Sequence, residues 1–321
     1  MSPDRYKHQC YLLMTLDPVH PGAGGYRLGR VDNSIAREPG TCLPKIPGSS
    51  LHGAARSYAA YLYETPEAAG QSQEKIDNPA QNPVCYTFGY IKGKQVSSGV
   101  VNIFDAHLLL FPVHSMVGPV WVTCPAALAT FEINCHRVSN EKARWPDTLT
   151  KQKRINLGWL MLERDDSAWQ PPTLNDVPQE VRDRLVLVPD NLFPHIVNSN
   201  LEVRTSVAIN PETGAAEGGA LYTYEAIPRA AFLTAEVVLD DYAQKFPADK
   251  CRQGLTEKQN PLPGGKWEGP LDVVRSGLKM IEYLSVGGMG TRGFGRIKVV
   301  GKPVEKSQEE IFKSLEGRNE P

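Results

Sequence analysis

The sequence lacks paired cysteines. Its six cysteines lie at positions 10, 42, 85, 124, 135 and 251 and form no C-x-x-C pair, so a structural zinc site has no support. Their wide scatter also differs from the disulfide framework of a small secreted domain. No signal-like apolar segment stands near the start, and no apolar run is long enough to span a membrane. These absences predict a soluble cytoplasmic protein without structural zinc or a membrane partner.

An excess of charge of one sign is also missing. The chain has 35 Lys and Arg residues against 36 Asp and Glu residues, which gives a net charge of -1. Proteins that bind nucleic acid over a broad surface are often basic. Any contact with nucleic acid must therefore come from a local patch. No internal repeat or low-complexity tract is present, and the 321 residues allow one large domain with insertions or two smaller ones.

Patterning predicts an α+β protein. The expected elements are a first strand over Gln9–His20, a long Gly- and Pro-rich loop over 21–49, and a helix over Leu51–Glu64 capped by Ser49 or Ser50. Residues 65–82 are polar and indicate an exposed insertion. Further strands are expected over 100–115 and 231–239, and a strand, turn and short helix over 116–136. This order fits a ferredoxin-like or RRM-like core with long insertions.

Residues 201–228 have the signature of a β-hairpin. Two β-like arms, "LEVRTSVAI" and "ALYTYEAI", flank the tip "NPETGAAEGG". Because the tip has no apolar anchor, the hairpin is expected to protrude. The charged segment from about 302 to 321 is expected to be a terminal tail with a short helix at Glu309–Leu315.

The stretch "VGGMGTRGFGR" (Val286–Arg296) contains the spacing G-x-G-x-x-G. A dinucleotide-binding loop follows a strand and opens a helix. Here a helix is expected before the loop, over about 270–285, and a strand after it, over 296–300. The loop therefore suits a phosphate chain held by backbone N–H groups better than a nicotinamide cofactor. On the loop alone, a tight helix-to-strand turn with two surface arginines is the commoner interpretation.

Five ordered motifs resemble one family. The glycine loop, "PKIPGSSLHGAAR" (Pro44–Arg56) and "GRVDNSIAREPGTCLP" (Gly29–Pro44) are similar to segments of the RAMP superfamily of CRISPR proteins. "FDAHLLLFPVHSMVGPVWVTCP" and "RTSVAINPETGAAEGGALYTYEAIP" narrow the resemblance to backbone subunits of type III-B (Cmr) effector complexes. The resemblance covers most of the chain. His52 and His114 depart from it, since lysine and arginine are expected there, and neutral histidines add no permanent charge at pH 7.

The resemblance implies a single RAMP domain over 1–321 with the hairpin as an inserted thumb. It further implies an antiviral CRISPR-Cas ribonucleoprotein in which copies of the chain stack along a guide RNA (crRNA) beside other Cmr-complex subunits. Such a subunit would be an endoribonuclease that cuts complementary target RNA at regular intervals. The products would be a 2′,3′-cyclic phosphate and a 5′-OH, and the reaction would require a divalent metal ion such as Mg²⁺ or Mn²⁺.

Asp32 matches the loop aspartate of the family and is the predicted catalytic residue. An isolated Asp is a weak general base, so we expect it to act through the divalent ion. On spacing alone, an Asp in a turn would be the commoner case. His20 could orient a phosphate or assist proton transfer, although a structural histidine is the more frequent case. Glu38 is a candidate metal group, equally consistent with a salt bridge to Arg37.

The remaining candidates are basic, small or hydroxyl residues expected to contact the RNA backbone: Lys45, Ser49, Ser50, Arg56, Arg204, Gly290, Arg292, Gly293, Gly295 and Arg296. A helix N-terminus favours anions, so the serines could cap and bind at once. Arg204 could equally be a solvated charge at a strand edge. Two alternatives stay open: a non-catalytic RNA-binding backbone subunit, and a metal-free guide-processing ribonuclease of the same superfamily that uses histidine.

Overall fold

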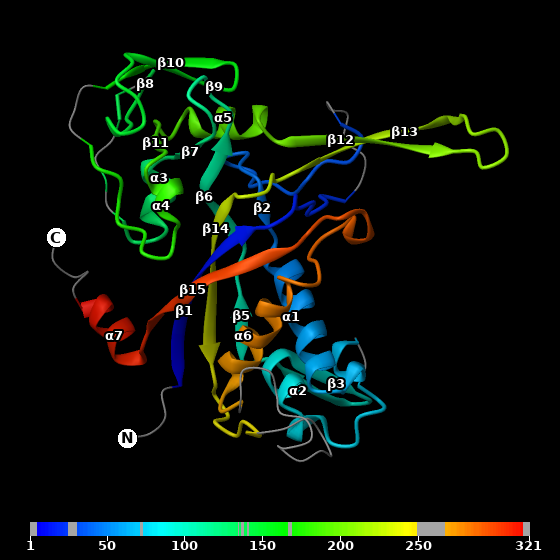
Figure 1. The fold of residues 1–321 in the computed structure, drawn as a ribbon. Helices are drawn as coiled ribbons and strands as arrows, with labels where there is room; N and C mark the ends of the chain where they lie inside the picture. Colours follow the sequence, from blue (N-terminus) through cyan, green and yellow to red (C-terminus); the bar gives the residue numbers. More distant parts are fainter. Residues whose placement is uncertain are drawn as a thin grey trace.

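The computed structural model of the chain describes residues 5–24, 31–70, 73–133, 135, 138–139, 141–165, 169–248 and 267–316 (Figure 1). Some predicted features, including Gly29, Cys251 and part of the linker before residue 267, lie outside these residues. No described helix has both the length and the apolar character that crossing a membrane would need.

Eight strands form the main sheet, in the order β11-β7-β6-β14-β1-β15, with β2 paired to β6 and β5 to β14. The β11–β7 pair is parallel, and the other pairs are antiparallel. The strands are β1 (Tyr6–Thr15), β2 (Lys45–Ile46), β5 (Val101–Ile103), β6 (Ala106–Val113), β7 (Val120–Thr123), β11 (Leu185–Leu187), β14 (Phe232–Asp240) and β15 (Ile297–Lys306).

Two helices complete the core. Helix α1 (Gly48–Leu62) follows β1, and α6 (Pro270–Met280) lies between β14 and β15. They pack side by side on one face of the sheet (Figure 1). Gly277 allows the close approach, because a Cβ there would lie 2.2 Å from the carbonyl oxygen of Ala55. With the strand order β6-β14-β1-β15, this is the βαββαβ arrangement of a ferredoxin-like core, and the prediction of that core is confirmed.

The two faces of the sheet bury different clusters. In β1, Tyr11 and Leu13 point into the cluster that contains the helices, whereas Leu12 points into a second cluster on the opposite face. Short helices α3 (Pro125–Ala129) and α4 (Gln179–Arg182) contribute to that second cluster. An RRM stacks RNA bases on its open sheet face. Here that face is covered by the cluster around Leu12 and is not open in the way that an RRM sheet is.

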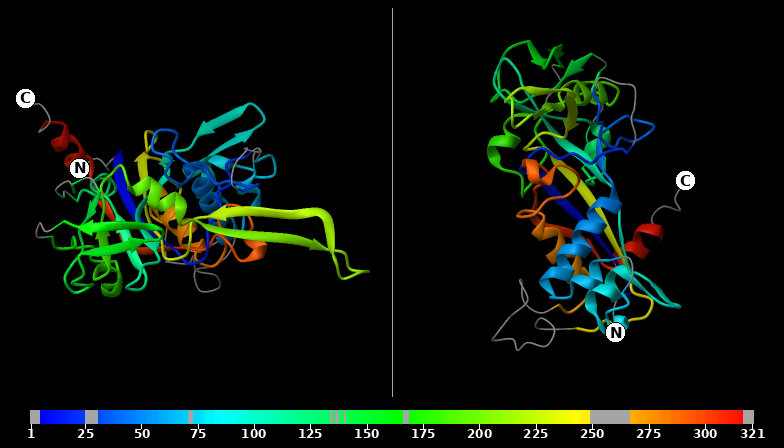
Figure 2. Two further views of the ribbon diagram at one scale, coloured as in Figure 1. Left: turned by 90° about the horizontal axis from the view of Figure 1, so that it is seen from above. Right: turned by 90° about the vertical axis from the view of Figure 1, so that its right-hand side faces the viewer.

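Smaller elements gather at the two ends of the elongated molecule (Figure 2). At one end are β8 (Lys142–Ala143), β9 (Arg154–Leu157) and β10 (Leu160–Arg164), which form a separate sheet. At the other are α2 (Pro83–Phe88), the pair β3 (Gly89–Lys92) and β4 (Gln95–Ser98), and turns η1 (Pro66–Ala69) and η2 (Pro79–Gln81). Helices α5 (Phe193–Ser199) and α7 (Gln308–Glu316) lie near the hairpin root and the C-terminus.

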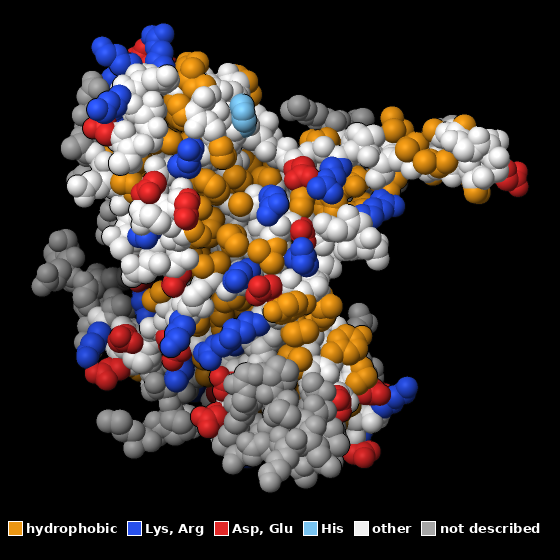
Figure 3. Space-filling model, viewed as in Figure 1, with side chains coloured by type: hydrophobic (Ala, Val, Ile, Leu, Met, Phe, Trp, Pro, Cys, Tyr) orange, Lys and Arg blue, Asp and Glu red, His pale blue; other side chains and the backbone are white. Residues whose placement is uncertain are grey.

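The hairpin consists of β12 (Glu202–Ile209) and β13 (Ala216–Ala226) and projects away from the body (Figures 1 and 2). Its surface carries exposed hydrophobic side chains, namely those of Val203, Val207, Ile209 and Leu221. Figure 3 shows hydrophobic side chains along the hairpin and Lys or Arg side chains near its base. An exposed apolar strand pair is unusual for a monomer and is typical of a surface that contacts a partner.

Several predicted boundaries were wrong. Helix α6 ends at Met280 rather than near 285, and α1 starts at Gly48. The cap of α1 is Pro47, not Ser49 or Ser50, and the Gly48 N–H donates to Asp105 Oδ1 at 2.7 Å. The segment 65–82 is not simply exposed, because Ala68 and Gln73 are fully buried. Strand β15 extends through Lys306, so the beginning of the expected tail belongs to the sheet, since β1 offers it an antiparallel partner.

Candidate nucleic-acid interface

The loop that contains Asp32 is bound to strand β13 of the hairpin. Asn33 forms a parallel bridge with Tyr224. The Asn33 N–H donates to the Thr223 carbonyl at 3.0 Å, and the Glu225 N–H donates to the Asn33 carbonyl at 3.2 Å. The loop thus lies along the free edge of β13 as a short additional strand. This placement could not be predicted from the sequence, because the two segments are about 190 positions apart.

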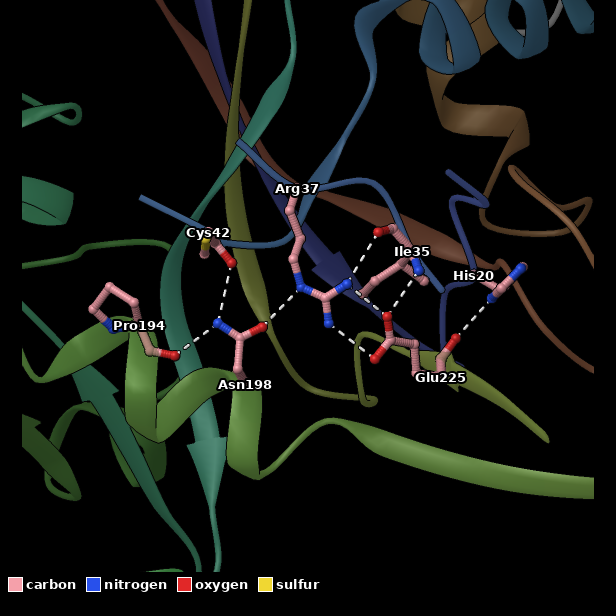
Figure 4. Close-up of polar contacts among 7 residues, drawn as sticks. All are labelled: His20, Ile35, Arg37, Cys42, Pro194, Asn198 and Glu225. Atoms are coloured by element: carbon pink, nitrogen blue, oxygen red, sulfur yellow. Dashed lines mark hydrogen bonds and ion pairs between the residues drawn. The ribbon is translucent and has the colours of Figure 1, made fainter. Parts of the chain in front are cut away.

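A buried ion pair fixes the C-terminal part of this loop (Figure 4). Arg37 donates from Nη1 and Nη2 to the two carboxylate oxygens of Glu225, at 2.6 and 2.9 Å. Its Nε donates to Asn198 of α5 at 2.9 Å, and the Ile35 N–H also donates to Glu225. The planar guanidinium fits the carboxylate in the bidentate geometry that makes such pairs strong. Arg37 therefore joins the loop, the hairpin root and α5.

Asp32 itself is held by one residue. Its carboxylate Oδ2 accepts hydrogen bonds from the Thr223 N–H at 2.6 Å and from the Thr223 hydroxyl at 2.9 Å. These bonds favour the ionised form, so the backbone and side-chain donors of Thr223 lower the pKa of Asp32 below its ordinary value. The side chain is exposed to solvent. A low pKa makes Asp32 a poor general base and a permanent negative charge at neutral pH.

The opposite face of β13 contacts the glycine loop. Tyr224 packs edge-on against Phe294 with ring centroids 5.4 Å apart, and Arg292 lies over the Tyr222 ring at 5.4 Å. Arg204 of β12 lies over Phe294 at 4.6 Å and pairs with Glu202. Arg204 is solvent-exposed, as a charge at a strand edge would be, and it also packs on Phe294. Two arginines and three aromatic rings form one cluster where the hairpin meets the loop, a combination suited to phosphates and stacked bases.

The glycine loop lies between α6 and β15, as predicted, and includes the single turn η3 (Gly290–Arg292). Gly293 and Gly295 have φ values of 80° and 94°, in the region that favours glycine. A Cβ at Gly295 would lie 2.5 Å from the Val286 carbonyl oxygen, so the chain turns tightly here. The loop is followed by β15 and lacks the long helix that follows a dinucleotide-binding loop.

A cleft of about 640 Å³ adjoins this loop. Its lining includes Tyr58, Tyr61, Tyr283 and Arg296. Tyr61 and Tyr283 are 61% and 73% exposed, and Arg296 pairs with Asp17 at the rim. Sequence reasoning missed these tyrosines, because tyrosine at helical spacing is usually a core residue.

Other predicted residues lie in different surroundings. Lys45 pairs with Asp105 at 2.5 Å, and Glu38 lies 3.2 Å from His107 rather than pairing with Arg37, so the predicted Arg37–Glu38 bridge was wrong. Ser49 and Ser50 are in the first turn of α1.

Arg56 does not extend into solvent. Its Nε donates to the Ala68 carbonyl at 2.8 Å, and burial lowers its pKa. This arrangement leaves the guanidinium directed at the protein.

His20 has a structural environment. It is 6% exposed, its Nδ1 is 2.7 Å from the Glu225 carbonyl oxygen, and it packs edge-on against Tyr224. Its backbone also bridges to Gly288 of the glycine loop. The ring therefore supports the junction of the loop and the hairpin, as the structural alternative predicted.

The chain offers few ligands to a divalent ion. No group of three His, Cys, Asp or Glu side chains that could hold a metal occurs among the described residues. Asp32 Oδ2 is engaged by Thr223, which leaves Oδ1 for a ligand. Mg²⁺ is commonly bound by one or two carboxylates together with waters and substrate phosphates. Asp32 fits that mode as a single protein ligand, whereas Glu38 is occupied by His107 and Thr41.

Sequence reasoning also missed Thr223, Glu225 and Asn198. Each is an ordinary polar residue in its own segment, and its role comes only from a contact across the fold. The one signal available was the alternation of "YTYEA" in β13, which places Thr223 and Glu225 on the face opposite the two tyrosines.

Comparisons with known proteins find matches over most of the chain. The model of the RAMP superfamily matches residues 12–298. The CRISPR system Cmr endoribonuclease Cmr4 of Pyrococcus furiosus is 28% identical over 315 residues, which cover 91% of this chain and 95% of the relative.

Two solved structures share the fold. A cryo-EM structure of the type III-B Cmr-beta complex bound to cognate target RNA contains a chain with a TM-score of 0.63 and 15% identity, covering 91% of this chain and 96% of that one. The crystal structure of oligomeric Cmr4 from Pyrococcus furiosus has a TM-score of 0.55 and 20% identity, covering 94% and 98%.

Proposed function

The chain belongs to the RAMP superfamily, and from that membership we propose that it is a backbone subunit of a type III-B CRISPR effector complex. In this role it binds crRNA, stacks with further copies of itself and with other Cmr subunits, and cleaves complementary target RNA in the cytoplasm. The whole chain forms one RAMP domain with the hairpin as its thumb. The Cmr4 relative, which is named an endoribonuclease and aligns with most of the chain, supports this proposal.

The observation that carries the proposal is the position of Asp32. The loop that bears it is bound to one edge of β13, while the other face of the same strand contacts the glycine loop and its arginines. A strand that joins these two loops can align a strand of RNA held by cations and amides with a carboxylate. Arg292, Arg204 and Arg296 would contact phosphates of the guide, with Gly290, Gly293 and Gly295 allowing close approach of its backbone.

Asp32 would act as an ionised group. Because Thr223 stabilises the carboxylate, Asp32 is poorly suited to remove the 2′-OH proton unaided. Asp32 Oδ1 would instead hold a divalent ion, with Mg²⁺ or Mn²⁺ the candidates, and its other ligands would be water and RNA oxygens. When bound, the ion would stabilise negative charge on the scissile phosphate. Arg37 and Glu225 keep the loop from moving during this step.

His20 does not favour the alternative of a metal-free processing nuclease. That chemistry needs a histidine within reach of the RNA, and His20 is buried with Nδ1 at the Glu225 carbonyl. Asp32, by contrast, has an exposed side chain, and its Oδ1 accepts no hydrogen bond from another described residue. The non-catalytic backbone subunit remains the competing hypothesis for the experiment.

The test uses the complex reconstituted with crRNA and the partner subunits. Asp32→Asn keeps the shape of the side chain, and we expect it to lower target cleavage by at least about 100-fold while crRNA and target binding stay unchanged. Asp147→Asn is the matched control, since Asp147 is a surface carboxylate paired with Arg164 near the small sheet. EDTA should stop the reaction, and Mg²⁺ or Mn²⁺ should restore it. Normal cleavage by the Asp32→Asn complex would show that the subunit is only a scaffold.

A further inference from the structure

Every hydrogen bond that the structure gives Asp32 with another described residue involves Thr223. Thr223 donates its N–H and its hydroxyl to Asp32 Oδ2, and its Oγ1 also accepts from the Asp32 N–H at 3.1 Å. The Thr223 carbonyl accepts from the next residue of the loop, Asn33. The position of the carboxylate is therefore set by the hairpin rather than by β1 or α1.

We propose that Thr223 is a positioning residue that fixes the Asp32 carboxylate for target-RNA cleavage. The inference rests on the proposed function, in which Asp32 is the catalytic group. Thr223 would not touch the RNA itself. It would orient Asp32 so that Oδ1, which accepts no hydrogen bond from the described residues, points at its ligand.

The strand that contains Thr223 explains why the position is precise. Residues alternate in direction along β13, so Tyr222 and Tyr224 face the glycine loop while Thr223 faces the loop of Asp32. Tyr224 is 4% exposed and packed against Phe294. Thr223 is thus held on both sides by fixed neighbours. A displacement of the hairpin root would move the guide-binding cluster and Asp32 together.

The Thr223 hydroxyl donates a second hydrogen bond to Asp32 Oδ2, in addition to the one from the Thr223 N–H. The Thr223 N–H is available in any variant except proline, whereas the O–H donor is specific to Thr and Ser. Without it, Asp32 Oδ2 would keep one bond and could rotate. Loss of this hydrogen bond to a charged group, and of the alignment that it gives, should lower the cleavage rate by about 10- to 100-fold.

The experiment compares Thr223→Val and Thr223→Ser in the reconstituted complex under single-turnover conditions. Valine keeps the branched shape and β-strand preference but removes the hydroxyl, and serine keeps the hydroxyl. We expect Thr223→Val to cleave about 10- to 100-fold more slowly with unchanged target affinity, and Thr223→Ser to cleave at nearly the wild-type rate. Thr123→Val, which removes a buried hydroxyl from β7, is the control for loss of a threonine hydroxyl and should cleave normally.

The comparison with serine separates positioning from general damage. Thr223→Ser keeps the hydroxyl donor to Asp32 Oδ2 in a smaller side chain, so it should restore the rate that Thr223→Val loses. A variant that acted only through packing would not be restored by serine, which lacks the methyl group.

Three outcomes overturn the inference. Thr223→Val could cleave as fast as wild type while Asp32→Asn is inactive, or Thr223→Ser could cleave as slowly as Thr223→Val. If the Thr223→Val subunit fails to assemble into the complex, Thr223→Ala is measured in its place. If both variants fail to assemble while Thr223→Ser assembles, the Thr223 hydroxyl is needed for assembly and not for positioning Asp32. Full activity of Asp32→Asn would instead refute the proposed function, so the two failures are distinguishable.

Discussion

The ion pair between Arg37 and Glu225 gives a prediction whose size can be worked from the structure. Glu225 is 7% exposed and accepts three hydrogen bonds, two from Arg37 and one from the Ile35 N–H. Glu225→Ala removes the acceptor and leaves the guanidinium, whose side chain is 21% exposed, without its counter-charge. Breaking a buried pair by removing one partner costs about 3–5 kcal/mol.

That cost should be visible in the melting temperature. Unfolding entropy is about 2.1 cal/mol/K per residue, or roughly 0.7 kcal/mol/K for 321 residues, so a loss of about 4 kcal/mol lowers Tm by about 6 °C. The assay is thermal unfolding of the purified chain followed by circular dichroism. The loop 31–38 should also become more accessible to protease, because Arg37 no longer joins it to the hairpin and to Asn198.

A double-mutant cycle tests the reasoning. Arg37→Ala and Glu225→Ala should each destabilise the chain, and the double variant should lose about 1–3 kcal/mol less than the sum of the two single losses. Single losses that add to within about 0.5 kcal/mol would mean that the two side chains do not stabilise each other. A Tm unchanged in Glu225→Ala would refute the pair's role in holding the loop.

Four further substitutions should affect stability in directions that the structure determines. Gly277→Ala should lower the free energy of unfolding by about 1–3 kcal/mol, because the added Cβ would lie 2.2 Å from the Ala55 carbonyl oxygen. Gly53→Ala in the neighbouring helix α1 should raise it by up to about 1 kcal/mol, because a Cβ at Gly53 has no atom within 4 Å. Thr123→Val should stabilise by about 1 kcal/mol in urea unfolding, because the buried Thr123 hydroxyl has no hydrogen-bond partner among the described residues. Burial lowers the pKa of His52 in the folded chain below 6.5. The stability that neutral His52 contributes is therefore present above pH of about 6.5 and is lost as the pH falls through the pKa of the folded state. His52→Phe should show a smaller fall of Tm than wild type between pH of about 7.5 and 5.

The serines at the start of α1 show how a local rule can fail. Ser49 and Ser50 follow the pattern of an N-cap, yet α1 begins at Gly48, three residues before the predicted Leu51. Asp105, from the β5–β6 connection, accepts the Gly48 N–H. A carboxylate from a distant segment replaced the local cap. The Arg37–Glu38 prediction failed for the same reason, since Glu225 offers a buried bidentate partner that no neighbour in sequence can match.

The sequence by itself determined the elements of the core and their order, because period-two and helical patterns depend only on neighbouring residues. It also located Asp32 and the glycine loop, through motifs written in contiguous residues. Only the tertiary structure decided which groups meet. Thr223 and Asp32 are 191 positions apart. Arg204 of the hairpin lies over Phe294 of the glycine loop, and Arg292 of that loop lies over Tyr222 of β13. Such contacts depend on strand pairing and on how the hairpin root packs, and those are properties of the folded chain as a whole.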